Sequence, residues 1–196
     1  MRALGDISNG MQRFARKKYI MSLFIMLIGI LILMERSTVR LKEISGGSGM
    51  LDMQFGYSHV EVYHMMDSIG AAGRAIYSRL LGLDFIFVVI FMLLQSFLLT
   101  VLLRKAAVNQ HLQKLNMLPF VRSALDLLEN VFILVILFNY PAHSLTIVRI
   151  ASMITIFKWV VYYAIIAVAV ALGVLISYQV ILSKIQRKKH EIRGGE

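Results

Sequence analysis

Four long apolar stretches, separated by polar connections, dominate the pattern of hydrophobic positions along the chain. They cover residues 19–34, 85–103, 120–140 and 150–182. A helix rises 1.5 Å per residue, so about 20 apolar residues cross a hydrocarbon core of about 30 Å. The pattern predicts an all-α fold, a bundle of four transmembrane helices forming a single membrane domain over residues 1–196. The fourth stretch is longer than a crossing requires, so we expect one of its ends to project.

The connection over residues 35–83 is the largest polar part of the chain. Residues 45–49 read Ser-Gly-Gly-Ser-Gly, a composition typical of a flexible linker. Apolar residues then recur every three or four positions from Val62 to Leu80. This period predicts an amphipathic helix that lies on the outer surface and leads into the second span.

Composition narrows the class of protein. Hydrophobic residues make up 58% of the 196 residues and charged residues 16%, whereas soluble domains have about 45–50% and about 25%. These values exclude a soluble enzyme, a disordered protein and a fibrous protein. The chain has no cysteine, which excludes disulfides and thiolate metal sites. Phosphate-binding and dinucleotide-binding fingerprints are absent as well, so no cofactor is expected.

The formal net charge of +10 comes from 21 Lys and Arg against 11 Asp and Glu. Most of the basic residues fall in the N-terminal segment, the 104–122 connection and the tail 183–196. Cytoplasmic flanks of membrane spans are enriched in Lys and Arg. We therefore expect a multi-pass protein of the plasma or inner membrane with both termini in the cytoplasm. Its basic tail is expected to contact anionic lipid headgroups rather than nucleic acid.

Several ionisable side chains fall where lipid is expected, and each costs at least about 2.5–3.5 kcal/mol to insert. They are Asp84, Asp126, Glu129 and Lys158, with the amide of Asn130 beside them. Positions 126, 129 and 130 are spaced i, i+3 and i+4, which places them on one helical face. We expect that face to point into the bundle.

Depth along the helices predicts a partner for one carboxylate. Glu129 lies about 16 Å below the outer end of the third span and Lys158 about 13 Å below that of the fourth. The two can therefore pair, with Asn130 or Asp126 as second partner. Two alternatives stay open: Lys158 reaches the outer headgroups beside Trp159, and Asp126 caps the start of the third helix.

One metal-binding pattern occurs in the outer connection. Glu61-Val-Tyr-His64 is a Glu-x-x-His motif, and Asp67 follows on the same helical face. Di-iron bundles use two such motifs and two further glutamates. A solvated helix face is therefore the expected role, and no metal site is predicted.

Small residues in the fourth span, Ala167, Ala169, Ala171 and Gly173, repeat at four-residue spacing. Such spacing lets helices approach closely. We expect packing within the bundle, with homodimerisation as the alternative.

Short motifs in a fixed order form a further pattern. They are Gly70-Ala-Ala-Gly73-Arg74-Ala-Ile-Tyr77, Asp84 at the start of the second span, Asp126-Leu-Leu-Glu129-Asn130, Tyr140-Pro141 and Lys158-Trp159. The order resembles a widespread, mainly bacterial family of small four-span membrane proteins, over roughly residues 57–178. The resemblance implies one shared polar constellation and no reaction; its members are Arg74, Tyr77, Asp84, Asp126, Glu129, Asn130 and Lys158.

Three classes of function remain open. The first is binding of a lipid headgroup or small polar molecule in a pocket, held by Arg74 and Lys158 with Tyr77 as hydrogen-bond donor. The second is a structural or accessory subunit, whose partner is another membrane protein or a second copy of the chain. The third is an intramembrane enzyme with Asp126, Glu129 or Asp84 as acid or base. No nucleophile or metal cage accompanies these carboxylates, so catalysis is the least favoured.

Overall fold

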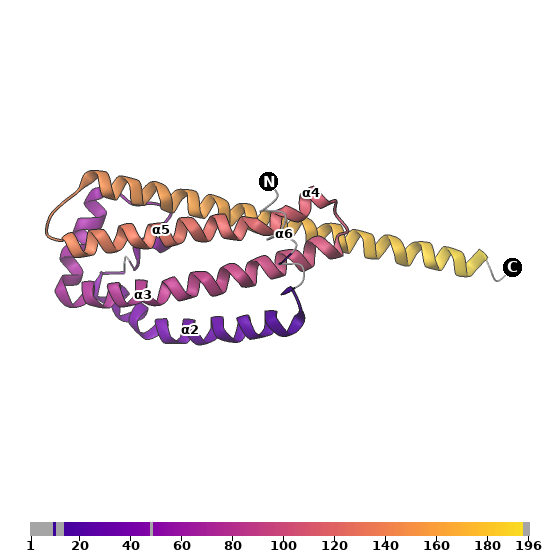
Figure 1. The fold of residues 1–196 in the computed structure, drawn as a ribbon, viewed down its shortest axis with the longest axis horizontal. Coiled ribbons are helices and arrows are strands. Elements are labelled where there is room, and N and C mark those ends of the chain that lie inside the picture. Colours follow the sequence, from indigo (N-terminus) through magenta and orange to yellow (C-terminus); the bar gives the residue numbers. More distant parts are fainter. Residues whose placement is uncertain (1–9, 11–13, 48, 194–196) are drawn as a thin grey trace.

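The computed structural model describes residues 10, 14–47 and 49–193, and it is built from helices, with no strand in this part of the chain (Figure 1). Four long helices lie side by side: α2 (Lys17–Ile44), α3 (His59–Lys105), α5 (Leu118–Asn139) and α6 (Leu145–Arg193). Three short elements connect them: η1 (Leu51–Met53), α4 (Gln110–Gln113) and η2 (Lys114–Met117). The predicted all-α bundle is confirmed.

Three of the long helices, α2, α3 and α6, are long and apolar enough to cross a membrane. The protein is therefore a membrane protein. α5 has 22 residues but carries Arg122, Asp126 and Glu129, all of which are buried. Its outward face remains apolar, as the exposed side chains of Val131 and Phe138 show.

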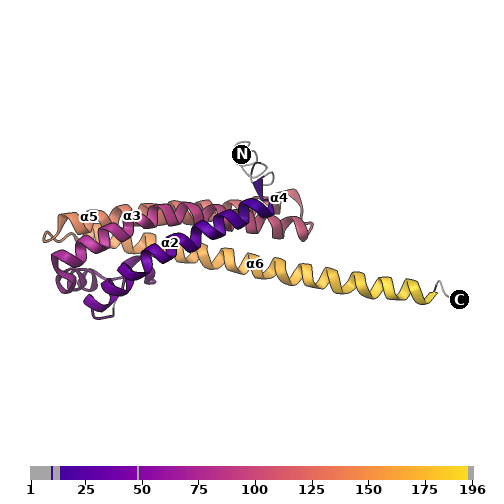
Figure 2. The same cartoon turned by 90° about the horizontal axis from the view of Figure 1, so that it is seen from below.

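The helices run alternately up and down (Figure 1). The α2–α3 connection and the α5–α6 turn lie at one end of the bundle, and α4 lies at the other. Figure 2 shows that α6 continues far beyond its neighbours. Every side chain over residues 177–187 is exposed, so this part of α6 extends beyond the other helices.

The amphipathic helix expected on the outer surface and the second span are one helix, α3, with a break inside it. Gly70 has φ 60° and ψ −171°, a conformation that other residues adopt only with strain. α3 begins with a capping box in which Ser58 Oγ accepts from the Glu61 N–H and the Glu61 carboxylate accepts from the Ser58 N–H. The sequence predicted the first span over 19–34, whereas α2 continues to Ile44.

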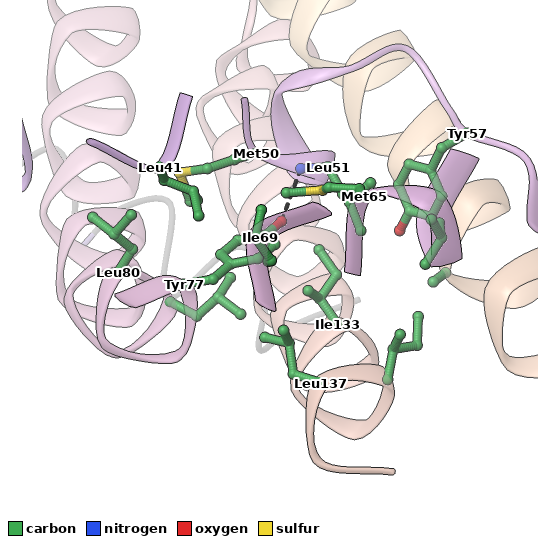
Figure 3. Close-up of a cluster of buried hydrophobic side chains, with 14 of the residues drawn as sticks. Leu41, Met50, Leu51, Tyr57, Met65, Ile69, Tyr77, Leu80, Ile133 and Leu137 are labelled. Carbon is green, nitrogen blue, oxygen red and sulfur yellow. Dashed lines mark hydrogen bonds between the residues drawn. The ribbon is translucent and has the colours of Figure 1, made fainter. Parts of the chain in front are cut away.

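A cluster of buried side chains from α2, η1, α3 and α5 forms the main core (Figure 3). It includes Leu41, Met50, Leu51, Met66, Leu80 and Ile133. The short η1 turn is therefore held inside the bundle rather than on its surface.

The chain after η1 closes against α6. A Cβ at Gly56, which has φ +103°, would lie 3.1 Å from Ile156 Cγ1. Next to it, the Tyr57 N–H donates to Ser152 Oγ at 2.9 Å. These contacts fix η1 between α3 and α6, where the polar side chains gather.

The four small residues of α6 differ in burial, and Ala169 and Gly173 are half-buried. Ala167 and Ala171 are exposed, so the bundle does not use this pair for its own close packing. Homodimerisation through this face stays a prediction.

Candidate functional site

A buried lysine holds the polar cluster together. Lys158 Nζ lies 2.5 Å from Glu129 Oε2 and 3.1 Å from Asp126 Oδ1, and it donates to the Asp52 carbonyl oxygen at 2.8 Å. An ammonium has three donors, and here three oxygens surround it, two in ion pairs and one as a hydrogen-bond acceptor. The predicted Glu129–Lys158 pair is present, and the alternative that Lys158 reaches the outer headgroups is wrong.

Both carboxylates of α5 have a second partner. Thr155 Oγ1, one turn before Lys158 on α6, lies 2.5 Å from Glu129 Oε1. Arg122 Nη2 lies 2.6 Å from Asp126 Oδ2 across one helical turn. Asp126 therefore sits between two cations. It does not cap the third helix, because α5 begins about two turns earlier, at Leu118.

Asp52 of η1 is a member of the cluster that the sequence did not indicate. It is 5% exposed, and its Oδ1 accepts from the Tyr77 hydroxyl at 3.1 Å. The Tyr77 oxygen in turn accepts from the Leu51 N–H at 2.8 Å (Figure 3). Burial raises the pKa of the Asp52 carboxyl, and the nearby ammonium of Lys158 opposes this only in part. Tyr77 thus fixes the turn that supplies a carbonyl to Lys158.

Asp84 and Asn130 form a second polar pair. The Asn130 amide donates to Asp84 Oδ2 at 2.6 Å, between α3 and α5. Asp84 is 7% exposed. Over the residues that the structure describes, no Lys or Arg lies within ion-pair distance of its carboxyl group.

Arg74 lies apart from the other predicted site residues. Its Nη1 donates to the Met66 carbonyl at 2.9 Å, and its guanidinium lies 4.0 Å from the centre of the Tyr140 ring. The Tyr140 hydroxyl donates to Asp67. The expectation that Arg74 shares a pocket with Lys158 is wrong, because Arg74 bonds back across the break at Gly70.

A polar cavity of about 200 Å³ lies beside the cluster. Asp84, Asp126, Lys158 and Arg122 line it, and half-buried aromatic rings complete its wall: Phe87, Phe91, Trp159 and Tyr162. The cavity therefore lies between α3, α5 and α6, next to Asp52 and Met53 of η1. Three of the seven predicted site residues, Asp84, Asp126 and Lys158, line it.

Three donors at this cavity are buried and unmatched. Arg122 Nε, Arg122 Nη1 and Trp159 Nε1 have no hydrogen-bond partner among the described residues. The Arg122 side chain is 10% exposed, and its guanidinium lies 5.2 Å from the centre of the Phe91 ring and 5.9 Å from that of Tyr162. A buried donor without a partner is costly, and the described residues supply no acceptor for these groups.

The chemistry of the site follows from its charges. Four carboxyl groups, of Asp52, Asp84, Asp126 and Glu129, gather around two cations. Lys158 is saturated, whereas Arg122 keeps free donors and Asp84 keeps a free acceptor. The arrangement suits a ligand with an acceptor at one end and a cationic donor at the other. Within the described ranges, no three His, Cys, Asp or Glu side chains are placed to hold a metal ion.

Comparison with protein-family models, curated proteins and solved structures gives no match to this chain.

Proposed function

We propose that this membrane protein binds a small polar group, free or as a lipid headgroup, in the cavity between α3, α5 and α6. The observation that carries the proposal is the Arg122 guanidinium, nine-tenths buried with two unmatched nitrogens. Leaving a buried donor unmatched costs about 1–3 kcal/mol, and more for a charged group. An acceptor from a ligand would remove that cost.

The residues in contact with the ligand differ from those expected from the sequence. Arg122 and Trp159 supply the donors, and Asp84 supplies an acceptor. Lys158 has no donor left for a ligand, so it positions Asp126 and Glu129 instead. Small sites with a few convergent polar groups in an apolar cleft are common in helical bundles.

We further propose that α5 crosses the membrane with α2, α3 and α6. The protein then lies in the plasma or inner membrane with both termini in the cytoplasm. The excess of Lys and Arg at one end of the spans supports this orientation. Because the chain has no cysteine, a single introduced cysteine reports which side of the membrane its position faces. In intact cells, a membrane-impermeant maleimide is expected to label Ala142→Cys and to leave Lys184→Cys unlabelled. The reverse pattern contradicts the orientation.

A structural role is the second candidate, and the saturated ammonium of Lys158 favours it. This group joins η1, α5 and α6 through three contacts. In an accessory subunit, such a junction would specify helix packing without any ligand. The resemblance to the bacterial four-span family fits either candidate.

Native mass spectrometry of the gently extracted protein separates the two roles. The wild type is expected to retain a bound small molecule. Trp159→Phe, which removes the unmatched N–H, should retain about fivefold less, since one hydrogen bond corresponds to about 0.5–1.5 kcal/mol. Tyr163→Phe, on an exposed neighbour, is the matched control and should not change retention. A wild type without any bound molecule, or retention that Trp159→Phe leaves unchanged, contradicts binding at this cavity.

A further inference from the structure

A second hollow lies next to the polar cavity. It is a groove of about 480 Å³ between α2, η1 and α3, and its walls are mostly apolar. The groove and the cavity share four lining residues, Asp52, Met53, Asp84 and Phe87. On the α2 side the groove is lined by Ile28, Leu31, Ile32 and Met34, among others.

We propose that the two hollows together bind one phospholipid with an ethanolamine-type zwitterionic headgroup. Its phosphate contacts Arg122 and Trp159, its ammonium contacts Asp84, and one acyl chain lies in the groove beside Leu31. This assignment rests on the function proposed above and names the class of ligand for the same cavity.

The phosphate is assigned from the number of free charged donors. Arg122 uses Nη2 for Asp126 and keeps Nε and Nη1. These two nitrogens face different sides of the guanidinium, and each can donate a charge-assisted hydrogen bond to an anionic oxygen such as that of a phosphate. Trp159 lines the same cavity, and its buried, unmatched indole N–H adds a third donor.

The positive end of the headgroup is assigned from the balance of charge. The two cations already pair with the carboxyl groups of Asp126 and Glu129, so a purely anionic ligand would add negative charge to a cluster that has no unpaired cation. Asp84 lines the cavity and has an amide, but no cation, as its neighbour. A ligand ammonium beside Asp84 supplies the missing charge, which favours a zwitterion over an anionic lipid.

The aromatic wall favours a primary ammonium over a quaternary one. Quaternary ammonium groups are bound by free aromatic faces. Here Arg122 already lies near the rings of Phe91 and Tyr162, and Lys158 lies 5.6 Å from the centre of the Trp159 ring. A primary ammonium instead uses its N–H groups, which donate charge-assisted hydrogen bonds to the Asp84 carboxylate.

The groove identifies the ligand as a lipid rather than a soluble molecule. An acyl chain gains little from leaving other acyl chains, because lipid tails are as apolar as the groove. Affinity therefore comes from the headgroup, while the groove gives room for the chain attached to it. A bulky side chain in the groove should act by steric exclusion.

The test uses native mass spectrometry of the full chain, delipidated in mild detergent and given equal amounts of phosphatidylethanolamine, phosphatidylglycerol and phosphatidylcholine. We expect phosphatidylethanolamine to be retained at least about tenfold better, since a hydrogen bond to a charged group corresponds to about 10- to 100-fold in affinity. Asp84→Asn keeps the oxygen that accepts from Asn130 but loses the charge, so it should abolish this preference. Leu31→Trp should block the groove, whereas Leu33→Trp on the same helix, outside the groove, should not.

The outcomes separate the two proposals. If Trp159→Phe lowers retention but Leu31→Trp does not, the polar cavity stands and the assignment of a chain to the groove is overturned. Equal or better retention of phosphatidylglycerol or phosphatidylcholine overturns the ethanolamine headgroup. Phosphoethanolamine, the headgroup without chains, binding as well as the lipid shows that the ligand is a soluble molecule. Retention that none of these variants alters contradicts the cavity itself.

Discussion

Replacing Lys158 with methionine removes the ammonium at the centre of the cluster and keeps an unbranched apolar side chain. Glu129 is then left with the Thr155 hydroxyl alone, and Asp126 keeps Arg122. Leaving a buried charge without its partner costs about 3–5 kcal/mol. We therefore expect Lys158→Met to lower the free energy of unfolding by about that amount.

The companion variants isolate the ion pair. Glu129→Gln keeps an oxygen that accepts from Thr155, so we expect it to cost about 1–3 kcal/mol. The double variant Glu129→Gln/Lys158→Met removes both charges and leaves the Asp52 carbonyl without its donor, which again costs about 1–3 kcal/mol. The cost of the double variant should therefore be smaller than the sum of the two single costs, by about 3–5 kcal/mol.

Equilibrium unfolding in mixed detergent and SDS micelles, followed by circular dichroism, measures these differences. Lys184→Met, at an exposed position of the same helix, is the control and should stay within about 0.5 kcal/mol of the wild type. If the cost of the double variant equals the sum of the two single costs, Glu129 and Lys158 are not coupled, and the assignment of the cluster is refuted.

Three further predictions concern the scaffold, each measured as a change in thermal unfolding. Gly70→Ala should cost about 1–3 kcal/mol because of its positive φ, whereas the control Gly82→Ala, where a Cβ meets nothing within 4 Å, should be neutral or stabilising; equal effects at both sites contradict a strained break. Tyr77→Phe should cost about 1–3 kcal/mol, since Asp52 and a backbone N–H lose their partner, and an unchanged midpoint would show that η1 is held by packing alone. Ser58→Ala should cost about 0.5–2 kcal/mol through loss of the cap. No change would show that the cap does not contribute to the stability of α3.

The features of the fold and site that depend only on helical periodicity could be predicted from the sequence. The four apolar stretches gave the long helices, and the i, i+3, i+4 spacing placed Asp126, Glu129 and Asn130 on one buried face. Distance along two antiparallel helices then matched Glu129 with Lys158. Each of these inferences needs only the geometry of a helix.

Contacts that depend on tertiary structure could not be predicted. Asp52 lies in a short turn, and its bond with Lys158 joins residues 106 positions apart. No helical periodicity in the sequence indicates this contact. Arg74 is drawn away by the break at Gly70, which no helical pattern shows. Arg122 carries a signal, because Asp126 follows it at i+4, but the distribution of basic residues assigns it to the cytoplasmic 104–122 connection.

The cluster also has a consequence for how the chain enters the bilayer during synthesis. If α5 crosses the membrane, as we propose above, it would on its own bring three charged side chains into lipid, at about 2.5–3.5 kcal/mol for each. The cation that neutralises its glutamate arrives only with the following helix. We therefore expect α5 to wait at the translocation machinery until α6 has been made, and the two helices to move into the membrane together as a hairpin.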